Sequence, residues 1–260
     1  MALTEHQGRR YARHVSLPEV GEAGQERLLR ARVLVVGAGG LGSPAVAYLA
    51  AAGVGAIGVA DGEVVELSNL QRQIIHATSE LACPKTQSAA RRLHDLNPEV
   101  RVIPHEDRLS ARNLPGIIQD YDFILDCTDN IASRYLLNDA CVLTGKPLSH
   151  AAVARFEGQI TTIVPGRGPC YRCLYPEPPA PGAVPDAAQA GIFNIAPAVI
   201  GAMQAAETMK WILGAGELLV GRLVVYDALT ASFCEVLVER DPNCAVCGSE
   251  PTITQLRDIR

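Results

Sequence analysis

Two pairs of cysteines with metal-ligand spacing lie in the second half of the sequence. Cys170 and Cys173 form one Cys-x-x-Cys pair, and Cys244 and Cys247 form another much further along the chain. Each pair can hold one edge of a tetrahedral zinc ion, and two pairs leave no open position, which is typical of a structural site. Unpaired thiols or two separate redox motifs are the alternatives. If zinc is bound, the fold must bring the two pairs together.

A glycine-rich loop with the sequence GAGGLG spans residues 37–42, after a short β-branched run. Gly39, Gly40 and Gly42 permit a tight turn and let backbone N–H groups approach a phosphate at the start of the next helix. Asp61 ends the next predicted strand, where a carboxylate can accept hydrogen bonds from ribose hydroxyls. The combination indicates a nucleotide but not which one, since an NAD-dependent oxidoreductase would also satisfy it. A tight strand-to-helix turn without a ligand is the remaining alternative.

Cations and carboxylates further along could complete a polyphosphate site. Arg72 and Lys85 can neutralise phosphate charge, although either alone is also typical of a solvated surface. The run of residues 126–130, DCTDN, follows a predicted parallel strand, at the end where open α/β sheets bind ligands. An aspartate such as Asp129 can hold Mg²⁺ there through one carboxylate, with waters and phosphate oxygens completing the shell. For Asp129 and Asn130 the alternative is a helix N-cap, because a helix is expected next.

These residues require a scaffold in which strands and helices alternate. Apolar runs predict strands at 32–36, 56–60, 100–104 and 122–127, with helices at 45–52, 85–95 and 133–144. Such alternation implies right-handed βαβ units around a parallel sheet. Further strands are expected at 159–164, 223–226 and 234–238, with a long helix at 197–213 and no helix between the last two strands. The predicted fold is therefore α/β, with a Rossmann-like parallel sheet extended by antiparallel strands into one mixed sheet flanked by helices.

Length and composition fit one globular domain over residues 1–260. It would comprise an N-terminal helical arm (1–30), a nucleotide-binding half (31–150) and a mixed-sheet half (151–260) with a proline-rich crossover loop at about 176–196. Lys and Arg total 23 against 28 Asp and Glu, a net charge of −5, which disfavours a nucleic-acid partner. Residues 33–60 are uncharged, but their glycines favour a buried strand–helix–strand unit over a membrane span. Without a visible signal peptide, the cytoplasm is the expected compartment.

Together these motifs resemble the superfamily of ubiquitin-activating-like enzymes, most closely the bacterial MoeB/ThiF/HesA adenylyltransferases. The resemblance runs from about residue 9 to residue 248. Dehydrogenases carry neither the NLQRQ run nor the paired Cys-x-x-Cys motifs. The segments that carry the resemblance are Arg10-Tyr-Ala-Arg13, the glycine loop, Asp61, Ser68-Asn-Leu-Gln-Arg-Gln73, Lys85, residues 126–130, Glu157-Gly-Gln-Ile160 and the two cysteine pairs.

The resemblance implies ATP-dependent adenylation of the C-terminal glycine of a small ubiquitin-like sulfur-carrier protein of the MoaD or ThiS kind. Such carriers serve molybdopterin, thiamin or related sulfur-transfer biosynthesis. It also implies a homodimer in which Arg13 reaches the partner subunit's site, and Mg²⁺ bound by Asp129. By position, the nucleotide-contacting residues would be Gly39, Gly40, Gly42, Asp61, Asn69, Arg72, Gln73, Lys85, Asp129 and Asn130. The catalytic residues among them would be Arg72, Lys85 and Asp129, together with Arg13.

One departure and several alternatives remain. Many family members carry a cysteine in the crossover loop, and here Ala187 stands in its place. We therefore expect activation of the substrate without a covalent sulfur or thioester link through that loop. A relative acting on another acceptor, such as a peptide C-terminus or a modified tRNA base, is one alternative. An NAD-dependent oxidoreductase and a non-catalytic, zinc-stabilised binding module are the others.

Overall fold

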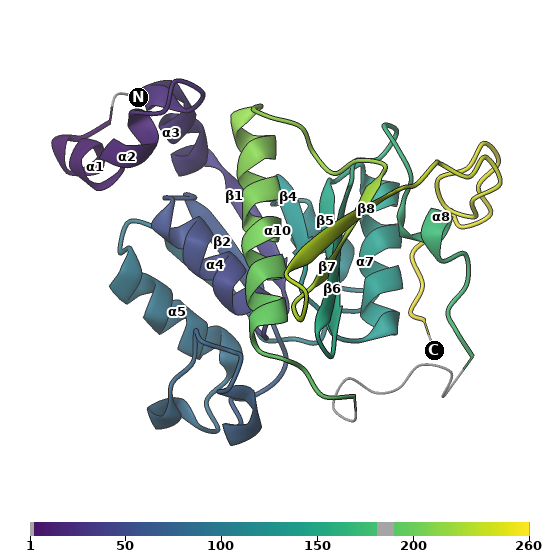
Figure 1. The fold of residues 1–260 in the computed structure, drawn as a ribbon, viewed down its shortest axis with the longest axis horizontal. Helices are drawn as coiled ribbons and strands as arrows, with labels where there is room; N and C mark the ends of the chain where they lie inside the picture. The colour runs from purple at the N-terminus through teal and green to yellow at the C-terminus, as the bar shows by residue number, and fades with distance from the viewer. Residues whose placement is uncertain (1–2, 181–189, 260) are drawn as a thin grey trace.

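The structure, a computed structural model, describes residues 3–180 and 190–259. Within these residues one mixed sheet has the strand order β3-β2-β1-β4-β5-β6-β7-β8 (Figure 1). Neighbours from β3 to β5 pair in parallel, whereas β5 to β8 pair antiparallel. The strands are β1 (Arg32–Val36), β2 (Ala56–Ala60), β3 (Arg101–His105), β4 (Phe123–Asp126), β5 (Leu148–Ala154), β6 (Glu157–Ile163), β7 (Arg222–Asp227) and β8 (Ser232–Leu237).

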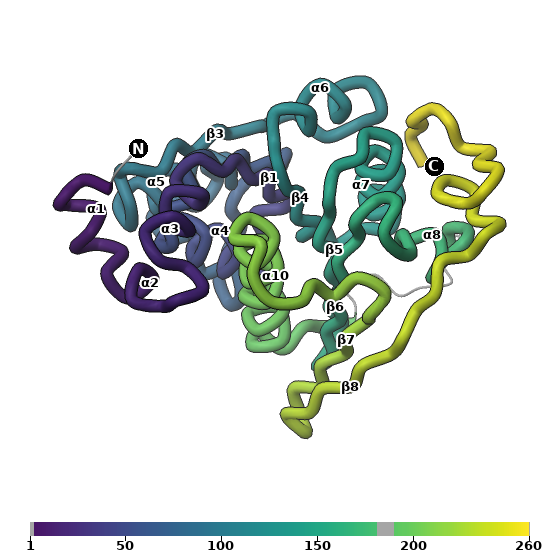
Figure 2. Tube along the Cα trace, turned by 90° about the horizontal axis from the view of Figure 1, so that it is seen from above, coloured from purple at the N-terminus to yellow at the C-terminus, as the bar shows by residue number. Residues whose placement is uncertain are grey.

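Helices cover both faces of the sheet. An arm of α1 (Glu5–Arg10), α2 (Ala12–Val15) and α3 (Gly21–Arg30) precedes the sheet. Helices α4 (Gly42–Ala51), α5 (Lys85–Leu96) and α10 (Ile195–Leu213) pack into one apolar core, whereas α6 (Leu114–Ile118), α7 (Ile131–Thr144) and α8 (Tyr171–Leu174) pack into the other. Figure 2 shows α10 and α7 on opposite sides of the central strands. Two short 3₁₀ helices, η1 (Leu67–Asn69) and η2 (Thr78–Glu80), lie in the connection from β2 to α5.

The predicted fold class is confirmed, because parallel and antiparallel strands form one mixed sheet flanked by helices. Strands β1 and β2 have the predicted bounds, and β3 and β4 differ from prediction by one residue at each end. The uncharged stretch 33–60 forms β1, α4 and β2, as expected. No helix within the two described ranges combines the length and the apolar character needed to cross a membrane.

Three expectations need correction. Helix α4 begins at Gly42 and not at residue 45, and the Ser43 N–H donates to the carbonyl of Gly39 within the loop. Helix α10 begins two residues earlier than predicted, at Ile195. Strand β5 was not predicted, and the boundary drawn after residue 150 falls inside it. The departure at Ala187 and part of the crossover loop lie outside the described residues.

Candidate functional site

The glycine loop joins the end of β1 to α4, and close backbone contacts require two of its glycines. Gly37 has φ +100°, and a Cβ there would lie 2.6 Å from the carbonyl oxygen of Cys127. A Cβ at Gly42 would collide with the carbonyl oxygen of Gly37. Only glycine meets both demands without strain. The loop consequently lies against the segment that follows β4, so the carboxyl ends of β1 and β4 meet at one place.

Asp61 lies beside this loop, as predicted. Its Oδ2 accepts a hydrogen bond from the Ala38 N–H at 2.8 Å, and its Oδ1 accepts one from the Glu63 N–H at 2.9 Å. The carboxylate is half-buried at the end of β2. Each oxygen keeps a second lone pair, so the group is held by backbone donors and can still accept from ribose hydroxyls.

The predicted segment 68–73 is also brought to the loop. A Cβ at Gly40 would lie 3.4 Å from Arg72 Cγ, and one at Gly39 would lie 3.7 Å from Gln73 Nε2. The carbonyl of Asn69 accepts the N–H groups of both Arg72 and Gln73, so Asn69 shapes this turn. Gln73 is 4% exposed and its Oε1 has no hydrogen-bond partner in the described part of the chain. An unpaired buried carbonyl next to a glycine loop fits a site that a ligand completes.

Lys85 begins α5 and is only 3% exposed. Its Nζ lies 2.6 Å from Glu63 Oε2, whose side chain is mostly exposed. A buried ammonium must be paired, and here an exposed carboxylate that follows Asp61 by two residues pairs it. The ion pair therefore holds a buried cation close to the segment that carries the ribose candidate.

His76 is a residue of this site that sequence reasoning missed. Its Nε2 donates to the Ala38 carbonyl at 2.9 Å, and its Nδ1 lies 2.7 Å from Ser88 Oγ. Burial lowers the pKa of His76, and the positive charge of Lys85 acts in the same direction. Asp61 and His76 thus hold the N–H and the carbonyl of the same loop residue, Ala38. The only sequence signal for His76 was its position just after the 68–73 run.

The two aspartates after β4 have different environments. Asp126 is completely buried, and its Oδ2 lies 2.7 Å from His150 Nδ1. Burial alone would raise the pKa of Asp126, but hydrogen bonds from His150 and Thr128 and the charge of Arg134 outweigh it and lower the pKa. Asp129 is exposed and its carboxylate has no partner within the described residues. It is therefore the aspartate that is open to a cation.

Asn130 is the N-cap of α7. Its Oδ1 accepts a hydrogen bond from the Ser133 N–H at 2.9 Å. For Asn130 the structure thus shows the capping interaction that was the alternative to ligand binding. Asp129 makes no such capping bond.

Arg13 is not brought together with the other site residues within one chain. It is exposed on α2, next to the buried Tyr11. The Tyr11 hydroxyl accepts a hydrogen bond from Asn97 Nδ2 at 2.8 Å, and its ring packs close to Gly53, which precedes β2. The arm therefore lies at the amino ends of the parallel strands, whereas the loop lies at their carboxyl ends. In Figure 1 the arm is at the top and the β2–α5 connection is at the bottom.

The four predicted zinc ligands do come together. Their sulfur atoms all lie within 4.8 Å of one another, with Cys170–Cys244 at 3.6 Å, Cys173–Cys247 at 3.4 Å and Cys170–Cys173 at 4.0 Å. Tetrahedral zinc with Zn–S bonds of about 2.3 Å requires sulfur–sulfur distances of about 3.8 Å. The arrangement is therefore compatible with a zinc ion bound by four thiolates.

The electrostatics of the cluster also favour a cation. Burial and the neighbouring Cys173 raise the pKa of Cys247 to about 11. Burial and the other three thiols likewise raise the pKa of Cys170. Burial alone would raise the pKa of Cys244 as well, but backbone N–H groups of Cys247 and Val246 outweigh it and lower the pKa. Without a cation, Cys170 and Cys247 are therefore held in the thiol form, because burial and the neighbouring sulfurs disfavour their thiolates.

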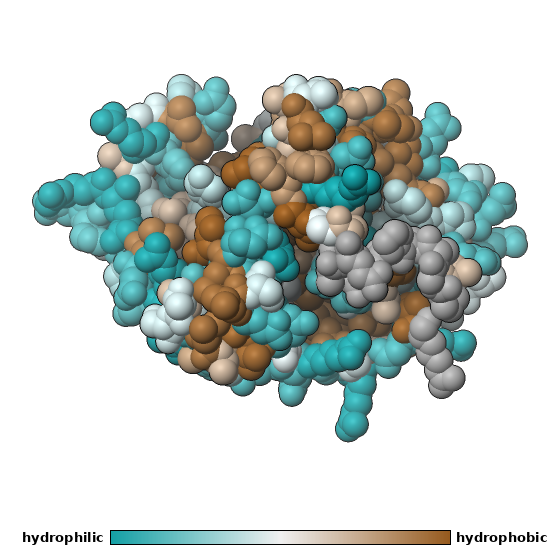
Figure 3. All heavy atoms as spheres, turned by 60° about the horizontal axis from the view of Figure 1, so that its bottom comes forward, coloured by the Kyte–Doolittle hydropathy of each residue, from teal (hydrophilic) through white to brown (hydrophobic). Residues whose placement is uncertain are grey.

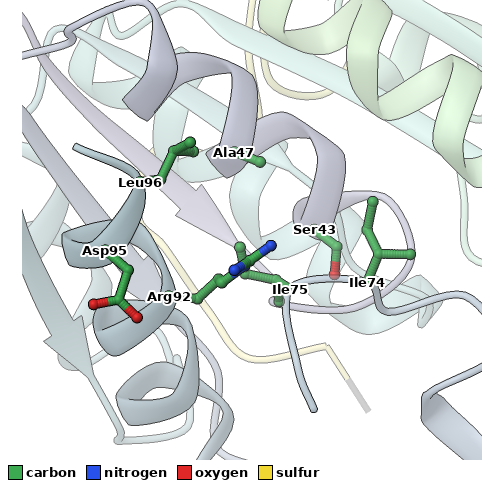
Figure 4. A pocket seen from close by; sticks show the side chains of 7 residues that line it. All are labelled: Ser43, Ala47, Ile74, Ile75, Arg92, Asp95 and Leu96. Atoms are coloured by element: carbon green, nitrogen blue, oxygen red, sulfur yellow. The ribbon is translucent and has the colours of Figure 1, made fainter.

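A cavity of about 360 Å³ lies next to the loop (Figure 4). Ser43 and Ala47 of α4, Ile74 and Ile75 of the β2–α5 connection, and Arg92, Asp95 and Leu96 of α5 line it. It does not include the glycine loop itself or Asp61. Ser43 Oγ is buried and has no partner among the described residues.

Fold and site together are typical of a nucleotide-binding α/β protein, here with a separate four-cysteine centre. The chain belongs to the ThiF family, whose model matches residues 11–246. It is 50% identical to the sulfur carrier protein adenylyltransferase of Thermus thermophilus, over 99% of this chain and 97% of that protein. It is 49% identical to the SAMP-activating enzyme E1 of Haloferax volcanii, over 100% of this chain and 95% of that protein.

A longer relative and a solved structure are also similar. The adenylyltransferase and sulfurtransferase MOCS3 of Sus scrofa is 45% identical over 99% of this chain, which covers 57% of that protein. The crystal structure of E. coli MccB with ATP matches with a TM-score of 0.81 at 23% identity, over 94% of this chain and 75% of that one. At that identity the match shows the fold alone. The predicted family and the predicted class of enzyme, an adenylyltransferase, are confirmed. The alternative of an NAD-dependent oxidoreductase is therefore set aside. The roles of the individual site residues stay predictions.

Proposed function

We propose that this chain activates the C-terminal glycine carboxylate of a small ubiquitin-like sulfur-carrier protein by ATP- and Mg²⁺-dependent adenylation. The products are an acyl-adenylate and pyrophosphate, and the pathway is molybdopterin, thiamin or related sulfur-transfer biosynthesis. One observation carries the proposal: half of the residues are identical, over nearly the full length of both chains, to a sulfur carrier protein adenylyltransferase. The gathering of Asp61, Arg72 and Gln73 around the glycine loop supports it.

Adenylation requires that the carboxylate and the α-phosphate be held in position and that their negative charge be offset. A carboxylate oxygen of the carrier bonds to the α-phosphorus of ATP, the bond to the bridging α–β oxygen breaks, and the electron pair leaves on pyrophosphate. No general base is needed, since the attacking carboxylate is already ionised at neutral pH. Two anions must approach one another, so cations that meet the charge developing on the phosphates lower the barrier.

Each predicted residue has a part in this scheme. Asp61 would hold the ribose and the loop N–H groups the phosphates. Arg72 and Lys85 would neutralise the phosphates, with a phosphate oxygen taking the place of Glu63 beside the buried Lys85 ammonium. Asp129 would hold Mg²⁺, and its exposed carboxylate, which has no partner in the described part of the chain, fits that role. A Mg²⁺ ion held there would supply positive charge that offsets the negative charge of the phosphates.

A homodimer is part of the proposal. Within one chain Arg13 lies at the opposite end of the strands from the loop, so only a second copy could deliver it to the site. Two exposed apolar side chains line the cavity beside the loop, Ile74 at 64% and Leu96 at 42% exposure. Tyr48, which follows the cavity-lining Ala47 on α4, is 61% exposed. Figure 3 shows apolar side chains gathered on the face that carries the β2–α5 connection. Such a patch suits burial against a partner.

Zinc at the four cysteines is the structural ion in this proposal. A shell of four thiolates has no open position for a substrate, so the ion would stabilise the fold and take no part in the reaction. The cysteines are all unpaired in the described residues, which supports the cytoplasm, a reducing compartment, as the place of the reaction.

ATP–pyrophosphate exchange tests the proposal. The purified chain should catalyse exchange only when a carrier protein ending in Gly-Gly is added, and mass spectrometry should find AMP on that carrier. A carrier truncated by its last two glycines is the matched control and should give no exchange. Exchange with a short peptide or a tRNA, and none with any carrier, would identify a different acceptor. No exchange with any acceptor would support the binding-module alternative.

A further inference from the structure

His150 lies in β5, only 2% exposed, in the middle of a buried polar network. Its Nδ1 lies 2.7 Å from Asp126 Oδ2, the last residue of β4. Its ring centroid is 4.5 Å from that of Tyr171, at an angle of 55°. Tyr171 stands between Cys170 and Cys173, so His150 connects β4 with the four-cysteine centre.

Asp126 fixes the backbone that leads to Asp129. Its Oδ1 accepts hydrogen bonds from both the N–H and the Oγ1 of Thr128, at 3.1 and 2.7 Å. Its carbonyl accepts one from Gln204 Nε2 at 2.9 Å. Since Asp129 directly follows Thr128, the carboxylate of Asp126 determines the direction in which the chain presents Asp129.

The segment between Cys170 and Cys173 also holds the middle of α7, the helix that follows this turn. The Tyr171 N–H donates to Asn138 Oδ1 at 2.8 Å, and Arg172 forms two 2.8 Å hydrogen bonds with the Asp139 carboxylate. Asn138 and Asp139 belong to α7, which begins two residues after Asp129. Asp129 therefore lies at the junction of a strand and a helix, both tied to the same centre.

The choice of histidine needs an explanation. An apolar ring would make the contact with Tyr171 equally well and would carry no nitrogen that needs a partner, but it would leave the buried Asp126 Oδ2 without its hydrogen bond. His150 Nε2 is buried with no hydrogen-bond partner in the described residues. An unpaired buried nitrogen is unfavourable, so the hydrogen bond of Nδ1 with the ionised Asp126 must offset that cost.

We propose that His150 is a positioning residue for the metal site: it holds Asp126, and through Asp126 and Thr128 it holds Asp129 in the orientation that binds Mg²⁺. The inference rests on the proposed function, in which Asp129 is the Mg²⁺ ligand. Residues that orient a metal ligand without touching the metal typically change metal affinity by about 10- to 100-fold when replaced.

Two replacements of His150 separate its hydrogen bond from its ring. H150F keeps a ring against Tyr171 and loses the donor, whereas H150N keeps a side-chain N–H close to the position of Nδ1 and loses the ring. The measurement is Mn²⁺ binding in the presence of a non-hydrolysable ATP analogue, followed by electron paramagnetic resonance. We expect H150F to weaken Mn²⁺ binding by about 10- to 100-fold and H150N to restore most of it.

Two more variants complete the experiment. T128V removes the hydroxyl that donates to Asp126 with little change of shape, so it should also weaken Mn²⁺ binding, even if H150F does not fold. T162V removes the equally buried hydrogen bond from Thr162 to Glu207, elsewhere in the sheet, and should leave Mn²⁺ binding unchanged. If T128V and folded H150F both bind Mn²⁺ with wild-type affinity, the positioning role of His150 is overturned, but the proposed metal site is not. No Mn²⁺ binding by the wild type with nucleotide would overturn the proposed metal site itself.

Discussion

Two residues of the same type can have different roles because their surroundings differ. Asp126 and Asp129 are three residues apart, yet the first is completely buried and hydrogen-bonded while the second is exposed and has no hydrogen-bond partner among the residues that the structure describes. A buried carboxylate whose hydrogen bonds are already made is a structural group, because freeing it for a metal would break those bonds. An exposed carboxylate at the carboxyl end of a parallel strand can bind a cation at little cost.

Replacement of Asp129 tests this distinction. D129A should lower the rate of ATP–pyrophosphate exchange by about 10²- to 10³-fold, the loss expected when one charge-stabilising group leaves an active site. Because the Asp129 side chain is exposed and has no hydrogen bond or ion pair within residues 3–180 and 190–259, the melting temperature and the zinc content should not change. The control is D120A, which removes an aspartate just before the amino end of the same strand, β4, and should exchange at the wild-type rate. Equal exchange by D129A and D120A would refute the metal role.

His76 makes the stability of the loop depend on pH. Burial lowers its pKa in the folded chain, whereas the unfolded chain keeps the ordinary value of about 6.5. Below that pH the unfolded state binds the proton more readily, so stability is full above about 6.5 and is lost as pH falls through the lower, folded pKa. Each unit by which folding lowers the pKa of His76 corresponds to about 1.4 kcal/mol in the free energy of unfolding that is lost in acid.

Thermal melts between pH 7.5 and 5.5 measure this loss. H76N cannot titrate, so its melting temperature should fall less over this range than that of the wild type. The exposed His94 supplies the control, and H94N should retain the wild-type decline. An unchanged decline in H76N would show that protonation of His76 does not limit stability in acid.

Which residues the sequence could reveal depended on local spacing. The glycine loop, the cysteine pairs and Asp129 are part of short motifs whose spacing suggested a nucleotide, a zinc ion and a Mg²⁺ ion, with alternatives left open for each. His76 and His150 belong to no such motif. Their partners, Ala38 and Asp126, are 38 and 24 residues away in sequence. The parallel pairing of β4 with β5 brings His150 to Asp126, and the path of the β2–α5 connection brings His76 to Ala38.

At the scale of elements, strands with a β-branched, apolar core were predicted closely. β1 (RVLVV) and β2 (AIGVA) have the expected bounds because buried parallel strands read as continuous apolar runs. β5 (LSHAAVA) was missed because serine, histidine and alanines give it neither such a run nor strict alternation. Its strand conformation comes from its position between β4 and β6, both of which pair with it.

The chain after β8 depends on the cysteine centre more than on regular structure. Residues 238–259 form no helix or strand, but Cys244 and Val246 are buried and Ile253 and Leu256 pack against the same core. The Ile253 N–H donates to the Ala245 carbonyl at 2.8 Å. A bound zinc ion would hold this segment to α8, since its ligands come from both.

C244S should therefore lose zinc and stability together. We expect less than one zinc per chain by elemental analysis and a lower melting temperature, at about 2–4 °C for each 1 kcal/mol lost. Lowering the pH should release zinc from the wild type as well, because protons compete for thiols such as Cys247, whose pKa without metal is about 11. C141S alters a buried cysteine outside the cluster and should retain zinc. Full zinc content in C244S would rule out the four-cysteine site.

At the scale of the whole molecule, the two ends of the parallel strands have different tasks. Their carboxyl ends carry the loop and the aspartates, while the helical arm covers their amino ends (Figure 1). Tyr11 anchors that arm through Asn97, whose Nδ2 also donates to the Ala50 carbonyl. Arg13 sits two residues from this anchor, so it cannot swing to the other end without unpacking a buried tyrosine. A symmetric dimer resolves the difficulty, since each arm would then serve the other copy's site.

Mixing two inactive variants tests whether the arm acts across the dimer. R13A and D129A should each be inactive alone as homodimers. After unfolding and refolding together in equal amounts, half of the dimers should be mixed, and in each of these one site has Asp129 from its own chain and Arg13 from the other. The mixture should therefore recover about a quarter of the wild-type exchange rate. If Arg13 served its own chain, every site in the mixture would lack one residue or the other, and no activity would return. The control mixture of R13A with wild type should retain about half of the wild-type rate in either case, so complementation by R13A and D129A is the result that distinguishes the two arrangements.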